Sequence, residues 1–551
     1  MRQPFFATAL LFAAPLAGQA PSDPSPAQVD SIFTKMNRSD GPGCALGVYR
    51  AGTVIYSNGY GLANLEHQIR ITPKTDFYIA STSKQFTAAS IALLAEAGRL
   101  DLNSPVRRYV PELPAYADSV TVLDLVHHTS GIRDYLTLWG QAGKSFGNDI
   151  GEDEALSSIV RQKALDFKPG TRWSYSNSGY FLLSVIVRRV TGKSLRQFSD
   201  SALFKPLGMN STHFHDDRMM VIPNRAEGYE PKGTGWAEHR TGFALVGDGG
   251  LHTTVEDLAR WDANFYDNKL GKGGPAFIEA ITTPGTLSGN RPMNYGFGLM
   301  REEYRGLPVV SHGGAFIGFR AALTRYPTRR LAVAVLCNDF SADPDAMVTR
   351  VADLYLAVPA PVVVAASGTV RKITPARLAA YAGRYEIFLG VPVVLSARDS
   401  TLAAEYMGRP AVTLARKSDS SFAFPVANIE LAFPLNPAGP TSELTMVSPR
   451  GVDRAPRLAD APTLSASDLV AYLGKYWSDE LQVSYSIEMT NGKLFLHRPG
   501  GPGVELKVIA PEMFAANVGK VAFRRGNDGK VAGFKLGTSR SEGIEFLRKE
   551  G

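Results

Sequence analysis

The chain has 551 residues, of which 44% are hydrophobic and 20% are charged, and its formal net charge is +7. This length exceeds what one hydrophobic core supports, so we expect a globular protein of several domains. The basic residues form no run of five or more along the sequence, and we therefore expect no nucleic-acid partner.

The first twenty residues have the pattern of a secretory signal peptide. Arg2 precedes an apolar run from Phe5 to Ala17, and small residues follow up to Ala20. Such a run is too short to span a membrane comfortably. We predict a signal peptide over residues 1–20, a periplasmic or secreted protein, and no membrane span in the mature chain. A buried N-terminal helix is the alternative.

Residues 22–360 combine strand and helix patterns. Two short strand patterns, GCALGVYRAG and TVIYSNGYG, lie near the start, and helical patterns dominate from residue 81 to 262. Three further strand patterns follow them: VVSHGGAFIG, GFRAALTRYP and LAVAVLCND. This order predicts an α+β domain in which helices pack around one antiparallel sheet.

The last third of the chain contains a repeat. After a linker at 361–373, LAAYAGRYE at Leu378 matches LVAYLGKYW at Leu469, 91 residues later. Alternating apolar patterns and turn residues follow each copy. We predict two small antiparallel β-barrel domains, 374–462 and 463–551, with a two-layer sandwich as the alternative.

Ser81 and Lys84 stand at the predicted start of an alanine-rich helix, in IASTSKQFTAASIALLAEAG. Residues three apart on a helix share a face, so the two side chains are expected to meet. A serine hydroxyl needs a nearby base to become nucleophilic, and a buried lysine can serve as one. The helix start adds N–H donors that suit a developing oxyanion. The alternative is a capping serine beside a solvated lysine.

Two later segments carry groups that could complete such a site. Tyr175 and Asn177 lie on a loop before a helix, where a phenol can relay protons and an amide can hold a carbonyl. His312, Gly314 and Ala315 lie on a strand, and glycines let a strand edge approach a ligand closely. Each segment alone also fits a purely structural role.

Together, in this order, the three segments resemble the penicillin-recognising serine hydrolases. Their Ser-x-x-Lys, Tyr-x-Asn and Lys/His-x-Gly elements match Ser81/Lys84, Tyr175/Asn177 and His312/Gly314. Further matches are LVHHTSGIRDY, PLGMNSTHF, GGLHTTVEDLARW and YGFGL, so the resemblance covers about residues 30–345. The superfamily includes class C β-lactamases, DD-peptidases, D-aminopeptidases and β-lactamase-like esterases.

The resemblance implies a role for each residue. Ser81 would be the acylated nucleophile, and Lys84 with Tyr175 would be the base system, without a choice between the two. Asn177 would hydrogen-bond the substrate, and the backbone N–H groups of Ser81 and Ala315 would form the oxyanion hole. No metal and no cofactor is implied.

The residue type at position 312 bears on which substrate we expect. In the class C β-lactamases, which belong to the family that this chain resembles, most members have a lysine where this chain has His312, and a neutral histidine binds an anion more weakly. We therefore expect a peptide containing a D-amino acid, as in the D-aminopeptidases and DD-peptidases. An ester or a β-lactam is the alternative substrate, and a non-catalytic protein that binds cell-wall peptide is the alternative class.

The resemblance also bears on the only two cysteines. In this fold the first strand lies antiparallel to the last, which would bring Cys44 near Cys337. The pair could form one cross-strand disulfide or remain two buried thiols, and we expect thiols. His213 and His215 have no accompanying ligand cluster in the sequence, and we expect a turn there without metal.

Overall fold

The computed structural model describes residues 23–147, 151–239, 242–356, 373–388, 391–406, 410–424, 429–435, 437, 439–448 and 451–549. The predicted signal peptide and all but the last residue of the predicted linker lie outside these ranges. Within them, no helix combines the length and the apolar character that a membrane crossing requires. The predicted domain boundaries stay predictions.

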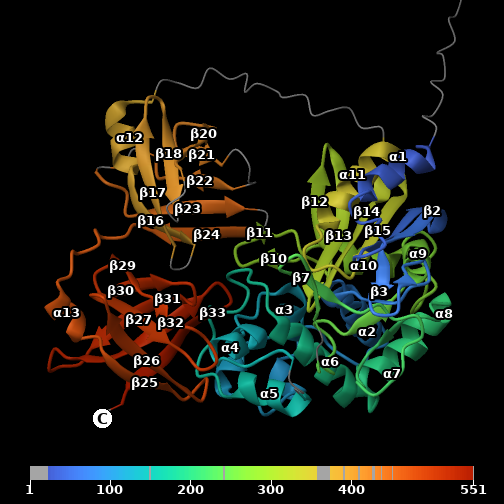
Figure 1. Cartoon of the computed structure of the whole chain (residues 1–551), viewed down its shortest axis with the longest axis horizontal. Helices are drawn as coiled ribbons and strands as arrows, with labels where there is room; N and C mark the ends of the chain where they lie inside the picture. Colours follow the sequence, from blue (N-terminus) through green and yellow to red (C-terminus); the bar gives the residue numbers. More distant parts are fainter. Residues whose placement is uncertain are drawn as a thin grey trace, which may run out of the picture.

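A six-stranded antiparallel sheet forms the centre of the N-terminal region (Figure 1). Its strands, in spatial order, are β12 (Met300–Tyr304), β13 (Leu307–Phe316), β14 (Phe319–Tyr326), β15 (Leu331–Cys337), β1 (Cys44–Arg50) and β2 (Thr53–Tyr60). Every residue of β15 is buried, which explains its unbroken apolar sequence. The edge strand β12 was not predicted, because its sequence MREEY is polar and mostly exposed.

Helices cover both faces of this sheet. On one face, α1 (Pro26–Asp30) and α11 (Pro344–Leu356) pack on Leu46, Val48 and Val333. On the other, α2 (Lys84–Glu96) and α9 (Val255–Asn264) share the main core with Ala45, Tyr49 and Ala334. Beyond them lie α3 (Val122–His127), α4 (Tyr135–Gln141), α5 (Glu152–Val160), α6 (Asn177–Thr191), α7 (Leu195–Ser199), α8 (Lys205–Leu207) and α10 (Pro275–Thr282).

Short strands connect the sheet to the helices. They are β3 (Leu62–Asn64), β4 (Ile69–Arg70), β5 (Phe77–Tyr78), β6 (His213–Phe214), β7 (Tyr229–Lys232), β8 (Gly235–Glu238), β9 (Leu251–Thr253), β10 (Thr286–Leu287) and β11 (Arg291–Pro292). Strand β5 pairs with β9 and leads directly into the segment that carries Ser81.

The two cysteines form a disulfide, so the expectation of free thiols is wrong. Cys44 begins β1, Cys337 ends β15, and the antiparallel register places them directly opposite each other. Such cross-strand neighbours bring their side chains into contact. The number of cysteines cannot distinguish a disulfide from two free thiols. The register between β1 and β15 does, because it places the two sulfur atoms within bonding distance.

The C-terminal repeat consists of two antiparallel β units. The first contains α12 (Pro375–Tyr381), β16 (Gly383–Phe388), β17 (Val391–Arg398), β18 (Thr401–Tyr406), β19 (Val412–Thr413), β20 (Ala415–Arg416), β21 (Ser421–Ala423), β22 (Glu430–Ala432), β23 (Glu443–Ser448) and β24 (Gly451–Pro456). The second contains α13 (Ala466–Val470), β25 (Gly474–Ser478), β26 (Val483–Thr490), β27 (Lys493–His497), β28 (Val504–Glu505), β29 (Lys507–Ala510), β30 (Met513–Ala516), β31 (Gly519–Arg525), β32 (Val531–Thr538) and β33 (Ser541–Arg548).

Both units use the same strand order. In the second unit, nine strands form one sheet whose two edge strands are β28 and β29. Only Leu506 lies between these two strands in the chain, so the two edges of the sheet are close together and the barrel is nearly closed. The first consists of a four-stranded and a five-stranded sheet, joined through a bridge between Tyr385 and Arg457. The repeated tyrosines Tyr385 and Tyr476 each donate a hydrogen bond to a carbonyl four residues earlier.

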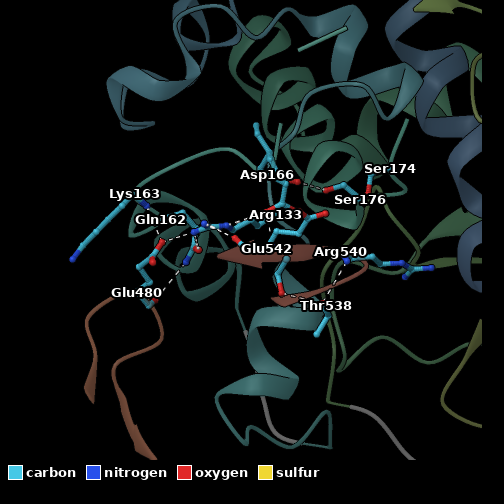
Figure 2. A network of polar contacts seen from close by, with 12 residues as sticks. Arg133, Gln162, Lys163, Asp166, Ser174, Ser176, Glu480, Thr538, Arg540 and Glu542 are labelled. Carbon is cyan, nitrogen blue, oxygen red and sulfur yellow. Dashed lines mark hydrogen bonds and ion pairs between the residues drawn. The ribbon is translucent and has the colours of Figure 1, made fainter. Parts of the chain in front are cut away.

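The second β unit packs against α4 of the N-terminal region (Figure 1). Leu138 of α4 and Ala142, which directly follows the helix, join the apolar core of that unit, and Tyr485 donates to the Gln141 carbonyl at 2.5 Å. A buried polar network, centred on Arg133, lies beside this contact (Figure 2). Arg133 pairs there with Asp166 of its own region and with Glu480 of the β unit.

Candidate active site

Ser81 lies in a tight turn that leads into α2. The turn, a 3₁₀-helix over Ala80–Ser83, begins with Ala80 at a φ of +46°, which is unusual for a residue other than glycine. Ser83 holds this conformation, because its hydroxyl donates to the Ala80 carbonyl at 2.5 Å and accepts from the Leu251 N–H at 3.1 Å. Strained backbone of this kind recurs at active sites. In this conformation the Ser81 hydroxyl oxygen contacts the Lys84 side-chain nitrogen.

Lys84 is fully buried, and its ammonium nitrogen contacts three oxygen atoms. The Nζ atom lies 3.1 Å from Ser81 Oγ, 2.9 Å from Asn177 Oδ1 and 2.5 Å from the backbone carbonyl oxygen of Asp248. All three partners are uncharged, and Lys84 forms no ion pair with any carboxylate in the described residues. The predicted contact between Ser81 and Lys84 is therefore present.

Asn177 is oriented by an aspartate that the sequence analysis did not identify. The structure begins α6 at Asn177, so the predicted loop ends one residue earlier, at Ser176. Asp134 Oδ2 accepts from both the backbone N–H and the Nδ2 of Asn177, each at 2.7 Å. Because the amide donates to Asp134, its oxygen faces Lys84. Asp134 belongs to the motif LVHHTSGIRDY, but only the tertiary structure reveals this role.

Asp248 contacts Lys84 through its backbone carbonyl, whereas its carboxyl group bonds to another residue. The carboxyl accepts from the Tyr135 hydroxyl at 2.9 Å, and burial raises the pKa of Asp248 to about 6, against the opposing charge of Lys84. Asp248 was not among the predicted site residues, because Asp-Gly-Gly is also a common turn sequence.

Tyr175 contacts Lys84 through its ring. Lys84 Nζ lies 4.8 Å from the ring centroid, within cation–π range. The Tyr175 hydroxyl is buried and has no hydrogen-bond partner among the described residues. The ring also packs on His128 at 4.3 Å between centroids. Burial and the charge of Lys84 lower the pKa of His128 well below 6.5, so His128 is neutral at pH 7.

His312 is a buried, neutral histidine. Its Nδ1 donates to the Gly313 carbonyl at 2.6 Å, which leaves Nε2 to accept from the Tyr295 hydroxyl at 3.1 Å. Burial, followed by the charge of Lys84, lowers the pKa of His312 to about 4. The partners assign this tautomer. His312 thus adds no positive charge to the site at pH 7.

Gly314 brings strand β13 against the turn of Ser81. A Cβ atom at this position would lie 2.3 Å from the Ile79 carbonyl oxygen and 3.1 Å from the Ser81 backbone nitrogen. Only glycine fits this approach. The next residue, Ala315, lines the same cavity as Ser81. The predicted strand edge therefore lies beside the serine.

A cavity of about 1980 Å³ opens above these groups. Ser81, Tyr175 and Asn177 line it from the N-terminal region. The first β unit contributes residues such as Met446, and the second contributes Arg540, from the turn between β32 and β33. The repeat pattern in the sequence left the role of the two β units open, and the structure places residues of both in the wall of this cavity.

Comparisons with known proteins identify the family to which the chain belongs. Residues 29–357 match the family described as Beta-lactamase. The D-aminopeptidase of Gluconobacter oxydans (strain 621H) is 32% identical over 306 residues, which cover 55% of this chain and 57% of that protein. The chain thus matches little more than half the length of this relative.

Two further similarities cover more of the chain. Penicillin-binding protein 4* of Bacillus subtilis (strain 168) is 28% identical over 411 residues, 70% of this chain and 88% of that protein. The octameric penicillin-binding protein homologue from Pyrococcus abyssi shares the fold with a TM-score of 0.54 and 24% identity, over 78% of this chain and 99% of that one. The family match spans more than half of the chain, which therefore belongs to the beta-lactamase family and with it to the penicillin-recognising serine hydrolases.

Proposed function

We propose that the chain hydrolyses an amide bond beside a D-amino acid through a covalent acyl-enzyme on Ser81. The contact of 3.1 Å between Ser81 Oγ and Lys84 Nζ, at the base of a cavity, carries this proposal. A serine that is hydrogen-bonded to a buried amine has the arrangement of an activated nucleophile.

Lys84 and its acceptors fit the role of a base. To act as a base, Lys84 first gives up one proton of its ammonium group, and the resulting neutral amine has two N–H donors and one lone pair. The Asn177 amide oxygen and the Asp248 carbonyl accept the two donors, and the lone pair then faces the Ser81 hydroxyl. In this arrangement Ser81 Oγ attacks the substrate carbonyl carbon while its proton moves to Lys84.

Tyr175 suits the transfer of that proton to the leaving amine. Its buried hydroxyl has no partner in the described residues, and its ring lies against Lys84. In the proposed reaction, the C–N bond breaks as the amine nitrogen takes the proton. A water molecule then attacks the acyl ester, and Ser81 is regenerated with the carboxylic acid as product.

The backbone N–H groups of Ser81 and Ala315 are proposed to hold the oxyanion. The close approach of Gly314 to the Ser81 nitrogen supports this pairing, because it sets the distance between the two segments. Two such donors stabilise the negative charge that develops only in the transition state.

The preference for D-amino acids rests on the relatives, of which one is named D-aminopeptidase. His312 is neutral at pH 7 and, unlike a lysine at this position, supplies no cation from β13 for the carboxylate of a β-lactam. Export through the N-terminal signal peptide and contact with cell-wall peptide belong to the same proposal.

The test is covalent labelling combined with turnover. We expect a fluorophosphonate probe to label the full-length enzyme, and Ser81→Ala and Lys84→Ala to abolish labelling. Ser90→Ala is the matched control, since this hydroxyl lies on the same helix and donates only to the Phe86 carbonyl. Parallel assays with a D-alanyl anilide, a nitrophenyl ester and a chromogenic cephalosporin rank the substrates, and we expect the anilide to lead. Absence of labelling would identify a non-catalytic peptide-binding protein.

A further inference from the structure

We infer that Arg540, on a hairpin of the second β unit, binds the carboxylate of the substrate's leaving group, which makes this enzyme selective for a free C-terminal D-amino acid. The inference rests on the proposed hydrolase function and specifies its substrate. It begins with the turn between β32 and β33, which reaches the active site from a distant part of the chain.

The hairpin is fixed to the catalytic region by its backbone. The Asp134 N–H donates to the Arg540 carbonyl at 2.9 Å, and the Ser174 hydroxyl donates to the Ser539 carbonyl at 3.3 Å. On the other side of the turn, Asp166 accepts from the Glu542 N–H at 2.7 Å. These contacts hold the turn in place without using the Arg540 side chain, which extends away from the network in Figure 2.

The Arg540 guanidinium is an available cation in the cavity. Among the described residues the guanidinium has no ion pair and no hydrogen bond. It makes one cation–π contact there, with the Tyr175 ring, at 4.9 Å from the guanidinium carbon to the ring centroid. The other Lys and Arg residues that line the cavity all have protein partners: Arg172, Arg291, Arg320, Arg454, Arg498 and Lys520.

The position of Arg540 identifies the part of the substrate that it would meet. Both cations contact the ring of Tyr175: Lys84 Nζ lies 4.8 Å and the Arg540 guanidinium carbon 4.9 Å from its centroid. In the proposed reaction the leaving nitrogen takes its proton on the Tyr175 side. In a peptide with a free C-terminus, the α-carboxylate lies two bonds from that nitrogen. Arg540 is therefore on the side of the leaving residue rather than the acyl group.

The chemistry favours a carboxylate at this place. A guanidinium matches a carboxylate with two parallel charge-assisted hydrogen bonds. His312 is neutral at pH 7 and cannot supply this charge. Arg540 thus provides from the second β unit the positive charge that the strand beside Ser81 lacks.

The experiment compares two substrates that differ only in that charge. N-acetyl-D-alanyl-D-alanine and its C-terminal carboxamide are assayed at pH 7.5 with the full-length enzyme. We expect wild-type kcat/KM to favour the free acid by at least tenfold, and Arg540→Met to lose at least tenfold of that ratio. Arg540→Lys should retain part of the ratio, because it keeps the charge without the planar fork. Arg524→Met, an exposed arginine of the same unit away from the cavity, is the matched control.

Fluorophosphonate labelling and thermal melting of each variant separate the possible outcomes. A ratio that falls in Arg540→Met but not in Arg524→Met supports the carboxylate anchor. Equal losses on both substrates overturn it, because they mean that Arg540 only positions Tyr175. Labelled wild-type enzyme that hydrolyses neither dipeptide, or both alike, also overturns it and leaves the serine hydrolase standing. Absence of labelling removes the hydrolase proposal and the inference together.

Discussion

Gly314 offers the sharpest test of the arrangement around Ser81. Its α-carbon faces the turn that carries the serine, and a methyl group there would lie 2.3 Å from the Ile79 carbonyl oxygen. Side-chain carbons tolerate 3.0–3.4 Å at the least, so Gly314→Ala must push β13 and the turn apart by roughly 0.7–1.1 Å. Backbone atoms rather than a flexible side chain form the obstacle, and no rotamer change relieves it.

That displacement acts on the proposed oxyanion hole. Its two donors, the N–H groups of Ser81 and Ala315, belong to the two segments that would separate. A misplacement of 1 Å costs on the order of 10²-fold in rate, and loss of one oxyanion donor costs about 10²–10³-fold. We therefore expect Gly314→Ala to lower kcat/KM by about 10²–10³-fold while the protein remains folded.

Gly313→Ala is the matched control for this substitution. A Cβ atom at Gly313 first meets the Asp345 carboxylate at 3.3 Å, which is the movable end of a side chain. We expect Gly313→Ala to change kcat/KM by less than threefold. The measurements are turnover of a D-alanyl anilide, the rate of fluorophosphonate labelling and far-ultraviolet circular dichroism. Equal activity in Gly314→Ala and Gly313→Ala would refute the role assigned to this strand.

Three further predictions concern pH, docking and the disulfide. Because the pKa of His312 is about 4 in the folded state and 6.5 when unfolded, its stabilising contribution is present above pH 6.5 and is lost as the pH falls toward 4. Between pH 7.5 and pH 4.5 the free energy of unfolding in urea should fall in wild type. In His312→Gln this fall should be smaller by up to about 3 kcal/mol. Arg133→Met removes the ion-pair partner of two buried carboxylates, Glu480 and Asp166, and we expect the free energy of unfolding in urea to fall by about 3–5 kcal/mol, against a smaller loss for Glu480→Gln. Thiol titration of the denatured, unreduced protein should find neither Cys44 nor Cys337 free, and reduction should lower stability by about 2–4 kcal/mol.

The local part of the site could be predicted from the sequence, because it depends on helix geometry. Ser81 and Lys84 meet since residues three apart at a helix start share a face. Asn177 accepts a hydrogen bond from the same lysine at the start of another helix; the family resemblance implied only that Asn177 binds the substrate, so this contact was not predicted. The hydroxyl of Tyr175 was expected to join the base system, and in the structure it has no hydrogen-bond partner in the described residues.

The supporting residues could not be predicted, because their roles depend on contacts between distant segments. Asp134 was not singled out in the sequence; in the structure one of its carboxylate oxygens caps α4 while the other holds Asn177. Arg540 stands in a hairpin turn far along the chain, and no local pattern indicates that this turn reaches Ser81. The disulfide of Cys44 likewise depends on a strand register that composition does not specify.

Adjacent residues connect the docking of the second β unit to the geometry of the active site. Arg133 fixes the N-terminal region to that unit through Glu480, and its neighbour Asp134 holds Asn177 against Lys84. Since consecutive residues share a peptide plane, movement of Arg133 on undocking also moves the aspartate that orients the amide. The backbone N–H of the same aspartate donates to the Arg540 carbonyl of the hairpin, so one segment positions both Asn177, which accepts from Lys84, and the proposed carboxylate anchor. Loosening this interface should therefore impair both the nucleophile and the substrate selectivity, even though no residue of the β unit bonds to Ser81 in the described residues.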